Sequence, residues 1–182
     1  MSLKDHRFCI APMMKKTDRH FRFLARQFTK KSMLYTEMIH SNAILKGDKD
    51  KLLSFSDIEH PVGLQLGGSD PEALAQAANI GQSFGYDEIN LNVGCPSKKV
   101  KSGNFGVFLM KDIDLLSSCI REIKKNITIP LSIKCRIGVD QFEGEEYLKN
   151  FIERIADTGI SLFIIHARKA ISGLDTKRNR SI

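Results

Sequence analysis

The stretch VGLQLGGSDPEALAQAANIGQSFGYDEINLNVG, residues 62–94, contains two short apolar runs separated by a helix-like segment. The runs at 62–68 and 88–94 contain Val, Ile and Leu and end in glycine, which is typical of buried strands. The segment between them opens with Ser69 or Asp70, either of which can cap a helix, and a proline follows at the first helical position. Strand, helix and strand in this order predict two parallel strands joined by a helical crossover.

The same alternation extends along the rest of the chain, and no internal repeat accompanies it. Further strand-like runs lie at residues 8–13, 33–38, 130–138 and 161–168, and further helix-like segments at 17–28, 112–127 and 143–159. In the first of these segments, apolar residues share one face at helical spacing, at positions 21, 24, 25 and 28. The sequence therefore predicts an α/β fold with a parallel sheet.

Each strand-like run carries a polar or otherwise unusual residue near its carboxyl end: Met13, Glu37, Gln65, Asn92, Lys134 and His166. Parallel strands gather their carboxyl ends on one rim, which holds the site of a (β/α)8 barrel, whereas an open doubly wound sheet uses only the ends near its switch point. Six contributing ends favour the barrel. A closed barrel needs eight strands and typically about 250 residues. The 182-residue chain is therefore predicted to form an incomplete TIM barrel with about six of eight βα units, truncated at its carboxyl end.

Composition narrows the class of protein. The chain is 42% hydrophobic and 27% charged, without an apolar run long enough for a membrane span and without a recognisable signal peptide, so we expect a cytoplasmic globular protein. The four cysteines form no CxxC pair and no zinc-like spacing, which predicts free thiols and no metal site. The net charge of +7 permits a polyanionic partner but does not by itself require one.

Several side chains are candidates for chemistry on residue type and position alone. Cys95 follows a strand end in a loop with glycine and lysine, so it could be a nucleophile, a general acid or a cysteine without a role. Lys134 lies in a β-branched strand, where it could face a negative charge on a ligand or extend its ammonium to solvent. Strand alternation places Arg136 on the same face as Lys134.

Polar side chains at three other strand ends are less specific. Gln65 can both donate and accept hydrogen bonds, which suits the edge of an imide-like ring. Asn92 could do the same or could cap its own loop. His166, taken alone, is more often a hydrogen-bonded structural residue than a ligand.

Six motifs, in order and spacing, resemble the tRNA-dihydrouridine synthase family and in particular its bacterial A subgroup: IAPM at 10–13, YTEM at 35–38, LQLGGSDP at 64–71, YDEINLNVGCPS at 86–97, IKCRIG at 133–138 and IIHARKA at 164–170. The resemblance implies an FMN enzyme that uses NADPH to reduce uridine to 5,6-dihydrouridine in the tRNA D-loop, at positions 20 and 20a for this subgroup. Dihydroorotate dehydrogenase, another flavin barrel, is disfavoured by the NVGCPS and HARKA stretches.

The resemblance also implies a role for individual residues. Cys95 would donate a proton to C5 of the uracil as general acid. Lys134 would lie beside the N1/O2 edge of the flavin and Gln65 at its ring edge, and further flavin contacts would come from Pro12, Met13, Met14 and His166. Contacts to tRNA would come from Asn92, Lys177 and Arg180.

The chain departs from the family pattern in several places. Lys15 and Lys16 replace an acidic and an aromatic residue, Cys135 replaces a histidine, and Val107 replaces a small residue. By this resemblance, residues 1–182 would correspond to the amino-terminal part of the FMN-binding TIM barrel, without its last two strands and without the helical tRNA-binding domain.

Three alternatives follow from this correspondence. The chain is a synthase fragment with impaired or lost activity, an inactive remnant or half of a split barrel that a second chain completes, or a basic RNA-binding fragment without catalysis.

Overall fold

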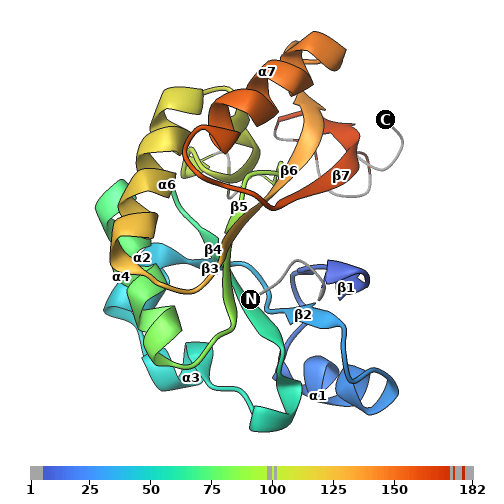
Figure 1. Cartoon of the computed structure of the whole chain (residues 1–182), viewed down its shortest axis with the longest axis vertical. Helices are drawn as coiled ribbons and strands as arrows, with labels where there is room; N and C mark the ends of the chain where they lie inside the picture. Colours follow the sequence, from blue (N-terminus) through green and yellow to red (C-terminus); the bar gives the residue numbers. More distant parts are fainter. Residues whose placement is uncertain (1–5, 98–99, 101, 173, 175–177, 179–182) are drawn as a thin grey trace.

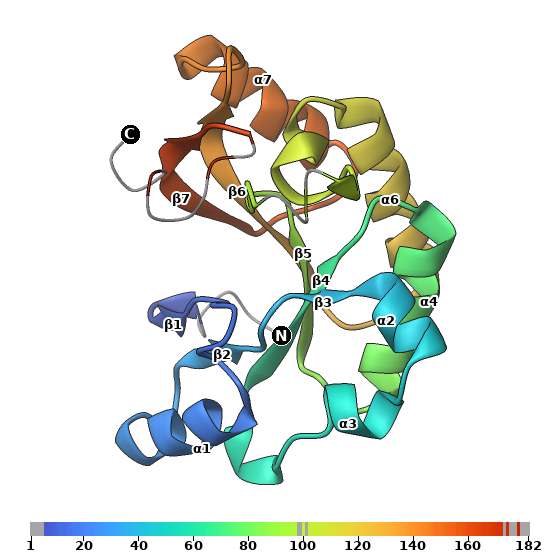
Figure 2. The same ribbon diagram turned by 180° about the vertical axis from the view of Figure 1, so that it is seen from behind.

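The structure is a computed structural model and describes residues 6–97, 100, 102–172, 174 and 178. Parallel strands alternate with helices and curl into an open half-barrel, as Figure 1 and the reverse view in Figure 2 show. The strands are β1 Cys9–Ile10, β2 Met33–Tyr35, β3 Ile39–His40, β4 Val62–Gly67, β5 Glu88–Asn92, β6 Leu131–Val139 and β7 Phe163–Ala170. The α-helices are α1 Arg19–Phe28, α2 Ser41–Lys46, α3 Lys49–Leu53, α4 Pro71–Ser83, α6 Ile113–Asn126 and α7 Glu145–Ala156, and the 3-10 helices are η2 Asp57–Glu59 and η3 Gly106–Met110.

The strands pair in the order β1-β2-β4-β5-β6-β7, every neighbouring pair being parallel, and β3 pairs with β4. This arrangement confirms the predicted α/β fold with an incomplete barrel. The six predicted strands correspond to β1, β2, β4, β5, β6 and β7. Strand β3 and the short helices α2 and α3 were not predicted, because none of them is long enough to show a clear apolar period.

Acidic side chains cap the amino termini of α4 and α6, whereas α7 begins after Gly144 without a side-chain cap. Asp70 accepts a hydrogen bond from the Ala73 N–H at 2.9 Å, and Pro71 occupies the first position of α4. Asp112 caps α6 in the same way through the Leu115 N–H at 3.0 Å. These local bonds satisfy amide groups that no helical carbonyl can reach, so the start of each helix is determined by neighbouring residues in the sequence.

Helix α1 buries a different face from the one that its apolar residues define. Leu24 and Phe28 are 56% and 84% exposed, whereas Arg22 and Arg26 are buried. The Arg22 Nε donates to the Glu59 Oε2 at 2.7 Å, and the Arg26 guanidinium donates to backbone carbonyls that include that of Glu59. The helix is therefore attached by charge-assisted hydrogen bonds, which a search for apolar period does not detect.

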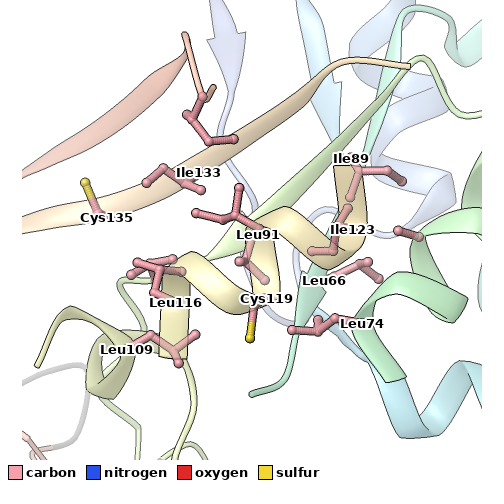
Figure 3. Packing of buried hydrophobic residues seen from close by; sticks show 14 of the residues in the cluster. Leu66, Leu74, Ile89, Leu91, Leu109, Leu116, Cys119, Ile123, Ile133 and Cys135 are labelled. Atoms are coloured by element: carbon pink, nitrogen blue, oxygen red, sulfur yellow. The ribbon is translucent and has the colours of Figure 1, made fainter. Parts of the chain in front are cut away.

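The main hydrophobic core lies between the sheet and the helices. Figure 3 shows strand residues packed against helix residues in this core, among them Leu66, Ile89, Leu91 and Ile133 from the sheet and Leu74, Leu116 and Ile123 from α4 and α6. Cys119 and Cys135 are completely buried here, and burial raises the pKa of the Cys119 thiol to about 12. All four cysteines are free thiols, as predicted.

Two further features are absent from the described residues. No helix in these parts of the chain has both the length and the apolar character needed to cross a bilayer. No group of three or more His, Cys, Asp or Glu side chains within the same parts could hold a metal ion.

Candidate active site

A cavity of about 470 Å³ opens at the carboxyl-terminal side of the sheet. Its lining combines three loops with β4, β5, β6 and β7, and consists of Pro12, Met13, Met14, Lys16, Met38, Gln65, Asn92, Gly94, Cys95, Pro96, Lys134, Arg136 and His166. Every predicted catalytic and flavin-contacting residue is in this set, together with Asn92. The other two predicted tRNA contacts, Lys177 and Arg180, lie outside the described residues.

Two of the predicted residues reach the cavity from the middle of a strand and not from its end. Strand β6 continues to Val139 and β7 to Ala170, well past Lys134 and His166. Lys134 nevertheless pairs with Asn92, the last residue of β5, and His166 pairs with Arg136. The prediction of strand ends was therefore wrong for β6 and β7, because the strands are staggered and have unequal lengths.

Hydrogen bonds fix the backbone on both sides of Cys95. The Asn92 Oδ1 accepts from the N–H groups of Gly94 at 3.3 Å and Cys95 at 3.0 Å. The Arg136 Nε donates to the Gly94 carbonyl at 2.7 Å, and the Val107 N–H donates to the Cys95 carbonyl at 3.1 Å. Asn92 therefore caps its own loop, one of the two predicted alternatives, and Cys95 is held half-buried at the wall of the cavity.

Gly106 packs tightly against this loop and has a positive φ of 61°. A Cβ at this position would lie 2.6 Å from the Val100 Cγ1 and 2.9 Å from the Cys95 carbonyl oxygen. Both the backbone conformation and the available space therefore require glycine.

The cavity is electrostatically positive. Burial lowers the pKa of Lys134, and the charge of Arg136 lowers it further. The pKa of His166 is lowered by burial and then by the charges of Arg136, Lys134 and Arg168. None of the ion pairs found among the described residues gives Lys134 or Arg136 a carboxylate partner. An anionic group in the cavity would relieve this crowding of positive charge.

Gln65 contributes a carboxamide to the floor of the cavity. Its Nε2 donates to the Asn90 Oδ1 at 2.7 Å, and its Oε1 accepts from the Asn92 Nδ2 at 3.0 Å. A carboxamide has two hydrogens and two acceptor lone pairs, so one of each is left over from these bonds. Gln65 can therefore donate to and accept from the edge of a bound ring.

Sequence reasoning missed some of the lining residues. Arg136 was placed on the same strand face as Lys134, and this alternation was the signal that could have identified it as part of the site. Met38 lines the cavity in place of its neighbour Glu37, which lines an adjacent cavity instead. Lys16 departs from the family pattern and also lies at the cavity, whereas Cys135 is buried in the core and cannot contact a ligand there.

Comparison with known proteins identifies the family of the chain. A family model described as dihydrouridine synthase matches residues 9–182. The chain is 54% identical over 174 residues to a tRNA-dihydrouridine(20/20a) synthase of Synechocystis sp., covering 95% of this chain and 52% of that protein. Proteins of the same name from Yersinia pestis and Xanthomonas campestris are 49% and 45% identical, over 97% of this chain and 51% and 53% of their own length. The chain thus spans about half the length of the curated relatives it matches.

Proposed function

Because the chain belongs to the dihydrouridine synthase family, we propose that it forms the amino-terminal part of an FMN-binding barrel that reduces uridine in tRNA to 5,6-dihydrouridine. The names of its relatives favour uridines 20 and 20a as the positions modified. The observation that carries the proposal is the juxtaposition of a thiol, Cys95, with the side chains of Lys134, Arg136 and His166 around one cavity. NADPH is the proposed source of electrons.

The residues around the cavity fit the ring system of FMN in chemistry. A volume of about 470 Å³ is in the usual range for small-molecule sites. Pro12, Met13 and Met14 offer apolar surface for a ring system, and Gln65 offers a donor and an acceptor for its edge. When bound, reduced FMN would supply the hydride for C6 of the uracil. Lys134 would hold positive charge beside the anionic edge of the reduced ring.

Cys95 is proposed as the general acid that completes the reduction at C5. As its S–H bond breaks, the proton forms the new C–H bond, and the electron pair stays on sulfur as a thiolate. Lys134 and Arg136 line the same cavity as Cys95, and their positive charges would offset the negative charge left on the sulfur. The bonds that Asn92 and Val107 make to the Cys95 backbone hold the thiol in place for the transfer.

The proposed tRNA partner agrees with the charge of the chain. A net charge of +7 favours a polyanion, and phosphate contacts would make binding weaken as salt concentration rises. Asn92 is the described residue proposed to touch the RNA, through the Nδ2 hydrogen that its bond to Gln65 leaves over. A uridine must leave its stack to reach the cavity, as in other enzymes that act on a base.

The decisive experiment separates the two half-reactions. The purified chain is incubated with FMN, its absorbance between 350 and 500 nm is recorded, and NADPH and then unmodified tRNA are added. We expect Cys95→Ala to leave flavin reduction by NADPH unchanged and to slow dihydrouridine formation by about 10²- to 10⁴-fold, the usual contribution of a general acid. Equal slowing of both steps would contradict the proton-donor role. RNA binding without flavin binding would instead favour a non-catalytic RNA-binding protein.

A further inference from the structure

A chain of hydrogen bonds runs through the buried face of the sheet, starting from a carboxylate that lies outside the cavity. The Glu88 Oε1 accepts from the Ser132 hydroxyl, and the same hydroxyl oxygen accepts from the Asn90 Nδ2 at 2.7 Å. The Asn90 Oδ1 then accepts from the Gln65 Nε2 at 2.7 Å. Glu88, Ser132 and Asn90 have no exposed surface, and Gln65 is 1% exposed.

This series of hydrogen bonds continues from Gln65 to the loop that carries Cys95. The Gln65 Oε1 accepts from the Asn92 Nδ2 at 3.0 Å. The Asn92 Oδ1 accepts from the amides of Gly94 and Cys95 at 3.3 and 3.0 Å. Asn92 is only 8% exposed, so this series of hydrogen bonds is largely buried between the carboxylate and the loop.

The groups at the two ends of this series of hydrogen bonds determine the orientation of every carboxamide between them. An ionised carboxylate can only accept hydrogen bonds, and a backbone N–H can only donate. Ser132 must therefore donate to Glu88 and accept from Asn90, so the Asn90 oxygen faces Gln65. Reversing one amide would place two donors or two acceptors in contact, and reversing all of them would leave the Glu88 and Ser132 oxygens facing each other without a hydrogen.

We propose that Glu88 is a positioning residue for Cys95, acting through the relay of Ser132, Asn90, Gln65 and Asn92. The carboxylate favours the same orientation that the amides of Gly94 and Cys95 require, with the Asn92 oxygen, and not its NH2 group, facing them. The loop that presents the thiol is thereby held by a group on the opposite side of the buried network. The consequence for proton donation rests on the proposed function, but the relay itself does not.

Tyr35 provides a matched control for this proposal. Its hydroxyl donates to the same Glu88 Oε1 at 2.7 Å, but it does not lie between Glu88 and the loop. Ser132→Ala and Tyr35→Phe each remove one buried hydroxyl bonded to one carboxylate oxygen. Ser132→Ala removes two buried hydrogen bonds, to Glu88 and from Asn90, whereas Tyr35→Phe removes one, so Ser132→Ala should cost more stability. Only Ser132→Ala interrupts the relay.

The readout is residue-resolved hydrogen exchange of the Gly94 and Cys95 amides, together with the rate at which iodoacetamide alkylates Cys95. We expect Ser132→Ala to raise exchange at Cys95 roughly fivefold, the equivalent of weakening one hydrogen bond, and Tyr35→Phe to change it less than twofold. Equal effects of the two substitutions, or none at Cys95, would overturn the relay.

Two substitutions of Glu88 give a second test, in which one variant keeps the acceptor oxygen for Ser132 and the other removes it. Glu88→Gln keeps an oxygen for Ser132 and turns its NH2 toward His6, whose Nε2 lies 2.7 Å from the Glu88 Oε2, so Cys95 exchange should match that of the unaltered chain. Glu88→Leu removes the acceptor and should raise exchange as Ser132→Ala does. Faster exchange in Glu88→Gln equal to that in Glu88→Leu would overturn the role of the carboxyl oxygen.

A measurement on the unaltered chain covers the case in which the variants do not fold. A scalar coupling across the hydrogen bond from the Cys95 amide nitrogen to the Asn92 Cγ is expected, and its absence would overturn the orientation. None of these measurements uses FMN, NADPH or tRNA. An inactive chain with an intact relay would therefore count against the proposed function alone.

Discussion

Substitution of Gly106 tests how tightly the Cys95 loop is packed. In Gly106→Ala the new methyl group would lie 2.6 Å from the Val100 Cγ1 and 2.9 Å from the Cys95 carbonyl oxygen, in a backbone with a φ of 61°. The positive φ costs about 1 kcal/mol and the overlap about 2 kcal/mol more. We therefore expect a total loss of about 3 kcal/mol, or a decrease of roughly 6–12 °C in Tm for a domain of this size.

Gly85→Ala is the control, because Gly85 also has a positive φ, of 93°, but the nearest atom to a new Cβ is the Phe55 Cζ at 4.0 Å. It should cost only the conformational term of about 1 kcal/mol, or roughly 2–4 °C. Thermal unfolding followed by circular dichroism measures both losses, and alkylation of Cys95 shows whether the loop has moved instead. If the two variants agree in Tm and in Cys95 reactivity, the reasoning from close packing is refuted.

Three further predictions concern charged groups. Lys134→Met should stabilise the ligand-free protein by on the order of 1 kcal/mol at neutral pH and so raise its Tm. The reason is that it removes a half-buried ammonium whose pKa is lowered by burial and by Arg136. The unfolded lysine binds its proton more tightly, so the difference in Tm should shrink as pH rises toward 10.5, and a constant difference would contradict this origin. The pKa of His166 is also lowered, so the unfolded state takes up a proton first as pH falls below 6.5. Denaturant titrations should therefore show the free energy of unfolding declining below this pH, and declining less steeply in His166→Asn. Equal dependence on pH in the two proteins would exclude this cause. Arg22→Met should cost about 3–5 kcal/mol of stability, because it leaves the buried Glu59 carboxylate unpaired. The double variant Arg22→Met with Glu59→Leu should recover most of this loss, as measured by urea unfolding. If the effects of the two substitutions simply add, the pair is not coupled.

Local signals in the sequence were sufficient for much of the fold. The caps at Asp70 and Asp112 act on amides three residues away, and the apolar runs of β4 and β5 reflect burial of the strands themselves. Because parallel strands bring their carboxyl ends to the same side, the sequence could also indicate that Gln65 and Asn92 would meet at one site.

Tertiary structure alone decided the features that depend on contacts between distant segments. The buried face of α1 follows from the bond between Arg22 and Glu59, which are 37 positions apart. The level at which Lys134 enters the cavity follows from the stagger of β6 against β5. The orientation of the amides that reach Cys95 follows from bonds between different strands. The sequence determined which side chains are available and which way each element faces locally. The distances between elements were set only when the sheet brought separate strands into register. Hydrogen bonds require atoms within about 3 Å, and no short sequence pattern encodes such proximity between distant segments.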